Sequence, residues 1–413
     1  MKKISLFIAV LTCSIWSFGQ SNNQEEYNRS SLYTITLLHS GDQMYNEILT
    51  AAQSLTIPDK YNDHSLNLRI LQSDKEKGKM LADKDENAEK LTSFISANQV
   101  AKRMVAKWFD RDNSTGAFDV ETLIQRGQYN VSSLELQKSM YTVTGKSYIA
   151  DADAELMPQT FVVINDITYV DKEKNAKIAG AVFKTLGSIA GQFFGGIGSL
   201  IKSAADLASS ISDLVAGFTI DVRSYLFQLE WNPEVSNTFY TNYFYDADHV
   251  DLQKKAAFEA DTTTFKMKYI GTFNARSEKT SPRGLYAQEE VFRKVLARAT
   301  DKNIVELQKQ YDVFKVTSIV TGITDKNEVY VPIGLKEGVS ATSKYEVLER
   351  VVDKTSIKYI RRAVITPKAQ EIWDNRYMAK EEEAKNADLQ QTTFTIQSQL
   401  SPIYAGMLVR EIK

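Results

Sequence analysis

The chain has 413 residues, and its 50 lysines and arginines nearly balance its 52 aspartates and glutamates. It contains no basic block of the kind that holds nucleic acid, so nucleic acid is not an expected partner. Its three histidines, His39, His64 and His249, lie far apart in the sequence, so no zinc site is expected either.

The first 19 residues have the features of a cleavable secretory signal. Lys2 and Lys3 give a positive start, residues 4–11 form an apolar core, and Ser17 and Gly19 supply small residues before the cut. The apolar run is shorter than the roughly 20 residues of a membrane-spanning helix. We therefore expect an exported protein that is periplasmic or outer-membrane-associated. Secretion out of the cell is the alternative.

Cleavage would leave residues 20–413 without a cysteine, because Cys13 is the only one in the chain. A lipid anchor on Cys13 is the alternative, although residues 10–12 form a poor lipidation box. A mature chain without cysteine has no disulfide, thiolate metal site or cysteine nucleophile. Its 394 residues are enough for two or three domains.

The pattern of residues 20–171 predicts an N-terminal α+β domain. Apolar alternation predicts strands at 32–37, 65–71 and 160–170. Helical spacing predicts helices at 42–55 and 91–109, the latter in one or two pieces, and another helix beginning at 120.

Residues 110–121 resemble the calcium loop of an EF-hand. Asp110, Asp112, Ser114 and Glu121 occupy positions 1, 3, 5 and 12 of such a loop. Position 6 needs glycine for its sharp turn, but the glycine of this segment comes one residue late. We therefore favour an Asx-rich turn between two helices and keep calcium binding as the alternative.

Residues 172–217 contain an apolar stripe at helical spacing. Its members are Ile178, Val182, Leu186, Ile189, Phe193, Ile197, Leu200, Ala204, Leu207, Ile211 and Leu214. Gly187, Gly191 and Gly195 repeat at every fourth residue, which would let a second helix approach closely. The pattern predicts a Gly-rich amphipathic helical hairpin, with helices at about 176–194 and 199–216.

Three interpretations of this hairpin remain open. The first is a hairpin packed on the neighbouring sheets, and the second is a segment that lies in a membrane interface or inserts after assembly. The third is a helix face for subunit contacts, which would make a homo-oligomer. The 17 uncharged residues between Lys184 and Lys202 fall just short of a bilayer span.

Residues 218–310 predict a β-rich segment followed by a helix. The strand at 218–231 changes phase, which indicates a bulge or burial on both faces. A second strand is expected at 265–273, and a helix at 288–311 whose apolar pattern lapses at 300–303.

An aromatic run follows the first of these strands, formed by Phe239, Tyr240, Tyr243, Phe244 and Tyr245. We interpret it as a core strand and its edge. A surface that stacks on sugars and a girdle at a membrane interface are the alternatives.

Residues 311–413 predict a small antiparallel β-domain. Strands are expected at 313–320, 328–333, 345–348, 356–363 and 405–412, with Gly322, Gly334 and Gly338 at turns. The order strand, Gly-Leu-x-x-Gly, strand over residues 327–348 resembles the small SH3-like barrels of bacterial envelope-assembly proteins.

Three strings of residues, 29–33, 58–64 and 108–130, resemble those of uncharacterised secreted proteins from Gram-negative bacteria. That resemblance brings no known activity, so it assigns no catalytic residue.

No catalytic or cofactor motif supports an enzyme. Gly145-Lys146-Ser147 lacks the first glycine of a phosphate loop, and no Gly-x-Ser-x-Gly elbow occurs. No cofactor and no catalytic residue are therefore predicted. We expect a multidomain, non-enzymatic envelope protein that binds a membrane surface or an envelope protein. A secreted hydrolase or glycan-binding protein that uses residues 239–245 is the alternative.

Overall fold

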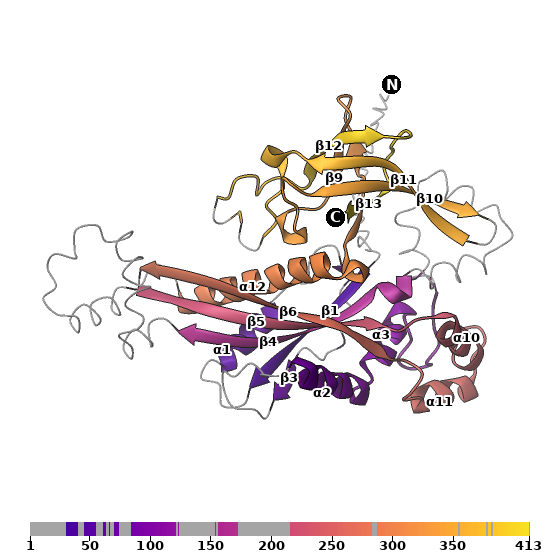
Figure 1. Ribbon diagram of the computed structural model, residues 1–413. Coiled ribbons are helices and arrows are strands. Elements are labelled where there is room, and N and C mark those ends of the chain that lie inside the picture. The colour runs from indigo at the N-terminus through magenta and orange to yellow at the C-terminus, as the bar shows by residue number, and fades with distance from the viewer. Residues whose placement is uncertain are drawn as a thin grey trace, which may run out of the picture.

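The computed structural model describes residues 30–39, 45–54, 61–62, 66, 70–73, 84–120, 123, 153, 156–171, 215–282, 287–353, 356–376, 379–380 and 383–412. Within them the chain is α+β (Figure 1). A mixed sheet with helices precedes a C-terminal antiparallel half-barrel, as the sequence predicts in outline. The expected helical hairpin falls outside the described residues, apart from its last three positions.

The N-terminal sheet combines segments that lie far apart in the sequence. Its strands are β1 (Ser30–His39), β2 (Tyr61–Asn62), β3 (Ile70–Ser73), β4 (Thr160–Asp171), β5 (Val215–Leu229) and β6 (Met267–Pro282). The order is β2-β1-β4-β5-β6, and β3 also pairs with β1. β1 is parallel to β2, β3 and β4, whereas β4, β5 and β6 form an antiparallel meander. Strands from residues 20–171 and from residues 218–310 thus share one sheet.

β5 is buried on both faces. Tyr225 and Phe227 pack with the core under α2 (Lys84–Ala97) and α3 (Val100–Trp108). Phe218 and Val222 pack with α1 (Tyr45–Ser54) and α12 (Gln288–Gln310) on the opposite face. This burial confirms one of the two interpretations of the phase change, namely that the strand is buried on both faces. The irregularity itself lies in β6, where the pairing with β5 shifts between Leu226 and Phe227.

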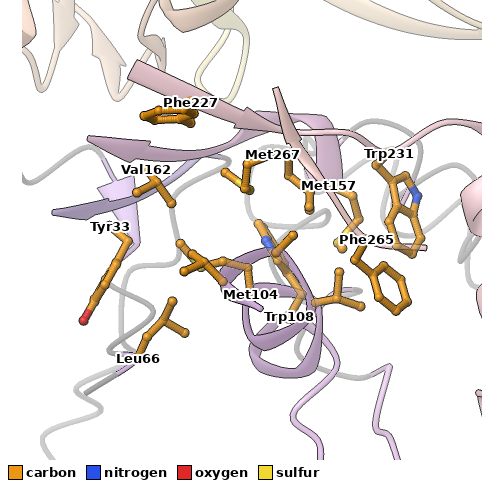
Figure 2. Packing of buried hydrophobic residues seen from close by; sticks show 14 of the residues in the cluster. Tyr33, Leu66, Met104, Trp108, Met157, Val162, Phe227, Trp231, Phe265 and Met267 are labelled. Atoms are coloured by element: carbon orange, nitrogen blue, oxygen red, sulfur yellow. The ribbon is translucent and has the colours of Figure 1, made fainter. Parts of the chain in front are cut away.

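The core on the α3 face is built from long apolar side chains around Trp108 (Figure 2). The Trp108 ring is fully buried, and its Nε1 donates a hydrogen bond of 2.7 Å to Thr160 Oγ1 at the start of β4. This bond satisfies the one polar atom of the ring, so the indole can lie in the apolar core without cost from an unpaired donor.

α12 is one continuous helix, although the apolar pattern lapses at 300–303. The lapse contains Asn303, which is fully buried and whose Nδ2 donates to Val222 O and Ser224 Oγ, each at 2.7 Å. α12 lies between the sheet and the half-barrel (Figure 1). A side chain at Gly338 in the half-barrel would come within 2.8 Å of Val305 Cγ1, so the two parts pack closely.

The half-barrel has seven antiparallel strands. They are β7 (Thr317–Ile319), β8 (Gly322–Ile323), β9 (Glu328–Val331), β10 (Lys344–Asp353), β11 (Ser356–Pro367), β12 (Thr392–Gln399) and β13 (Leu408–Ile412). Short 3-10 helices lie before β7 (Asp312–Phe314), between β9 and β10 (Leu335–Glu337) and between β11 and β12 (Ala369–Glu371). A fourth, Met157–Gln159, precedes β4 in the N-terminal sheet. The order is β7-β13-β10-β11-β12-β9-β8. The outermost strands are consecutive in the chain, and Val320 N donates to Met407 O while Thr321 N donates to Tyr330 O. The sheet therefore curls until its two edges meet at one bent segment.

Two sequence predictions of local structure are wrong. The aromatic run is not a strand, because it forms the end of helix α10 (Pro233–Asn242) and the turn after it. Asn232 caps that helix by accepting from the amides of Glu234 and Val235, and proline at the first helical position suits such a start. The hairpin was also expected to run to 217, but β5 begins at Val215.

Candidate functional site

The apolar stripe of residues 178–214 lies outside the described residues, but the strands on either side of it are described. β4 and β5 pair without interruption up to Asp171 and Phe218. β5 in turn pairs with β6 up to Val215 and Pro282. Both ends of residues 172–214 are therefore fixed at the same end of the sheet, where β4 and β6 end and β5 begins (Figure 1).

Aromatic packing and a cross-strand ion pair stabilise that end of the sheet. The Phe218 ring packs edge-on against Phe292 of α12 at a centroid distance of 5.2 Å, and Tyr169 contacts the same ring at 6.1 Å. Across the strands, Arg276 of β6 donates two hydrogen bonds from Nε and one from Nη2 to Asp221 of β5, at 2.9 to 3.1 Å. Residues 172–214 are therefore joined at both ends to a well-packed part of the sheet.

The aromatic run faces inward. Phe239 is fully buried, and Tyr243 and Tyr245 are buried, while Tyr240 and Phe244 are half-buried. Phe239 packs against Phe109, Phe118 and Trp231, among other rings. Burial, together with the nearby Asp153, raises the pKa of Tyr240. These rings form a core cluster and do not present an open stacking surface.

The segment that resembles a calcium loop closes on itself. Asp112 Oδ1 accepts hydrogen bonds from the backbone N–H and the hydroxyl of Ser114 and of Thr115, at 2.6 to 2.9 Å. These bonds, led by the one from the Ser114 hydroxyl, hold the pKa of Asp112 well below its usual range. Tyr245 Oη also donates to Thr115 O at 2.7 Å. The Asx-type turn predicted from the sequence is confirmed.

Calcium binding at this turn stays a prediction. Asp110 and Asp112 belong to the described residues, whereas Glu121 does not. Among the residues that the structure describes, no three His, Cys, Asp or Glu side chains gather in a way that could hold a metal ion. His249 pairs with Asp246, through Nδ1 and Oδ1 at 2.7 Å on the exposed surface, and this pairing raises the pKa of the imidazole.

A polar cleft of about 300 Å³ lies where the α2–α3 junction meets the chain that enters β6. One wall carries Gln99, and the other carries Asp261, Phe265 and Lys266, with Glu230 just beyond β5. A volume of this size is at the lower end of ligand-binding pockets. Its residues come from three separate segments, so no local pattern in the sequence could have singled them out.

Lys102 ties the two walls of this cleft together. Its Nζ donates to three carbonyl oxygens around the end of α11 (Leu252–Ala260), those of Phe258 at 3.2 Å, Glu259 at 3.1 Å and Asp261 at 2.7 Å. The ammonium also lies 5.5 Å from the centroid of the Phe258 ring. Burial lowers the pKa of Lys102, and Asp261 partly opposes this effect. All three N–H donors are used, so Lys102 is a structural cap for α11.

Gln99 has an unusual backbone for its residue type. It lies between α2 and α3 with φ 50° and ψ 39°, in the left-handed region. This conformation costs a residue other than glycine roughly 1–2 kcal/mol. Its N–H donates to Ser96 O, and its carbonyl accepts from Arg103 N, so both helices hold it in place.

Comparison with protein-family models gives no match, and comparison with the curated proteins gives none either. In the part of the chain that the structure describes, no helix has both the length and the apolar character needed to cross a membrane. The geometry of the described residues therefore carries the functional argument.

Proposed function

We propose that this chain is an exported, non-enzymatic protein of the cell envelope that attaches to a membrane surface, or to an envelope protein, through the apolar stripe of residues 178–214. The proposal places the mature protein in the periplasm or on the outer membrane. The signal-like residues 1–19 and the amphipathic pattern of residues 172–217 support it from the sequence.

The pairing of β4 with β5 is the observation that carries the proposal. It brings residues 171 and 218 side by side, so the 46 residues between them, 172–217, leave and return at one place. A segment held at both ends by a rigid sheet can reach a surface without disturbing the rest of the fold. β5 has 15 residues, so it extends for about 50 Å at about 3.3 Å per residue.

Flotation with liposomes of zwitterionic and anionic phospholipid tests this function. Residues 20–413 should float with the vesicles, and a variant with Phe193→Asp and Ile197→Asp should stay soluble and folded but no longer float. The two aspartates place charge in the apolar stripe, which a membrane interface strongly disfavours.

A matched control carries the same added charge elsewhere. Val250, just before α11, and Leu252, the first residue of α11, are exposed at 53% and 71%. A Val250→Asp, Leu252→Asp variant should float like the native chain. If the native chain does not float and the stripe variant unfolds, the stripe belongs to the core and the membrane interpretation fails.

A further inference from the structure

Hydrogen bonds within the protein hold both walls of the polar cleft between the α2–α3 junction and the 261–267 loop in place. The Lys102 cap joins α3 to the end of α11. Asp261 Oδ1 accepts from the backbone and hydroxyl groups of Thr263 and Thr264, at 3.0 to 3.3 Å, which fixes the loop after α11. The cleft is therefore preformed, and binding there would cost little ordering.

The aromatic cluster supports the loop from behind. Phe265 stacks on Trp231 with an interplanar angle of 10° and a centroid distance of 6.5 Å (Figure 2). Tyr243 Oη lies 3.1 Å from Thr264 Oγ1, so a hydrogen bond joins the aromatic run to the loop. Phe265, Met267 and Ile95 belong to the buried core, and the small part of each that is exposed forms the apolar floor of the cleft.

The groups left over for a ligand are mixed in character. Lys102 is occupied by carbonyl oxygens, and one oxygen of Asp261 is occupied by its own turn. Gln99, Glu230, Lys266, Ser96 and Thr262 also line the cleft, and no side-chain hydrogen bond within the described residues engages them. They supply one amide, one carboxylate, one ammonium and two hydroxyls.

This set does not suit a strongly charged ligand. The two lysines and two acids that line the cleft cancel, and the one lysine that is not engaged shares the cleft with a carboxylate. A phosphate or a metal ion would find too little net charge of either sign. Donors and acceptors around an apolar floor instead match a neutral molecule that has hydroxyls on its edge and C–H groups on its face.

We infer that this cleft binds one unit of a neutral saccharide, a second binding site apart from the stripe of residues 178–214. The sugar face lies on the floor of Phe265 and Met267. Gln99 and Glu230 on opposite walls bond its hydroxyls. Gln99 lines the cleft from a left-handed backbone position, where a glycine would be more stable but could not bond a ligand.

Saturation-transfer NMR on folded residues 20–413 tests this inference, with glucose, N-acetylglucosamine and cellobiose as separate millimolar probes. Protons of at least one sugar should receive saturation from the protein. Gln99→Gly should weaken that binding at least tenfold, although glycine relieves the left-handed backbone and so leaves the fold intact. Glu230→Gln, which keeps the shape of the side chain, should weaken it as well.

Two controls make the result decisive. Glu234→Gln removes the same charge from an exposed site on α10, outside the cleft, and should leave sugar binding unchanged. Glycine, used as a small zwitterionic probe, should receive no saturation. The inference is overturned if no sugar receives saturation, if binding survives undiminished in Gln99→Gly and Glu230→Gln, or if glycine binds in place of the sugars. Vesicle flotation does not enter this test, so the two proposals can fail separately.

Discussion

Asn303 shows how one buried polar side chain ties a helix to a sheet. Besides its two bonds to β5, it is linked through Ser224, whose Oγ donates to Asn165 Oδ1 on β4 at 2.5 Å. A single helix residue therefore engages two neighbouring strands. The apolar spacing of α12 lapses at this residue because a buried polar side chain takes the place of an apolar one.

Replacing Asn303 with alanine should destabilise the protein. Val222 O and Ser224 Oγ would lose a donor in a site without access to water, which costs about 1–3 kcal/mol. Urea unfolding would measure this loss. Lys302→Ala, at the exposed neighbouring position, should change the free energy of unfolding by no more than about 0.5 kcal/mol. Equal effects of the two substitutions would contradict the role given to the buried network.

At the scale of elements, a nearly buried carboxylate joins three strands of the half-barrel. Glu346 of β10 accepts from Arg361 of β11 at 2.8 Å and from Arg410 of β13 at 2.5 to 3.0 Å. Burial raises the pKa of Glu346, but the hydrogen bonds from the two arginines outweigh it, and the net pKa is lowered. The ionised form of Glu346 therefore stabilises the folded state.

This lowered pKa predicts a pH dependence. A carboxyl with a lower pKa in the folded state stabilises above its unfolded value of about 4.3, and the stabilisation is lost as the pH falls through the folded value. At about pH 7, Glu346→Gln should cost about 1–2 kcal/mol, since both arginines are half exposed. The cost should shrink steadily as the pH is lowered below about 4. Urea titrations of both proteins across this range would show it, and a cost independent of pH would refute it.

Local patterns predicted most of the elements. The strands β1, β4, β5 and β6 and the helices α1, α3 and α12 all occur where apolar spacing placed them, although β6 is longer than expected. β12 escaped prediction because Phe394 and Ile396 are its only large apolar residues, so the alternation is too short to stand out. The aromatic run was misread because its apolar density resembles a strand, while the decisive signal was the cap at Asn232 and Pro233.

At the scale of the whole molecule, the order of strands could not be predicted. β1 and β4 are separated by more than 100 residues and β4 and β5 by 43, so their pairing depends on contacts that no short pattern encodes. The sequence therefore suggested separate segments at 20–171 and 218–310, whereas strands from both meet in one sheet. The pairing of β4 with β5 turned an isolated apolar stripe into a segment fixed at both ends.

Attachment through residues 178–214 is the central claim, and a single fluorescent probe tests it most directly. Because Cys13 is the only cysteine of the chain, residues 20–413 offer no competing thiol. An environment-sensitive dye on Ile197→Cys should shift to the blue with phospholipid vesicles and be quenched by quenchers on the lipid chains. The same dye on Leu252→Cys, an exposed position, should do neither. If the dye at Ile197→Cys keeps its emission when vesicles are added, the stripe does not enter the membrane and the proposed attachment to a membrane surface is wrong.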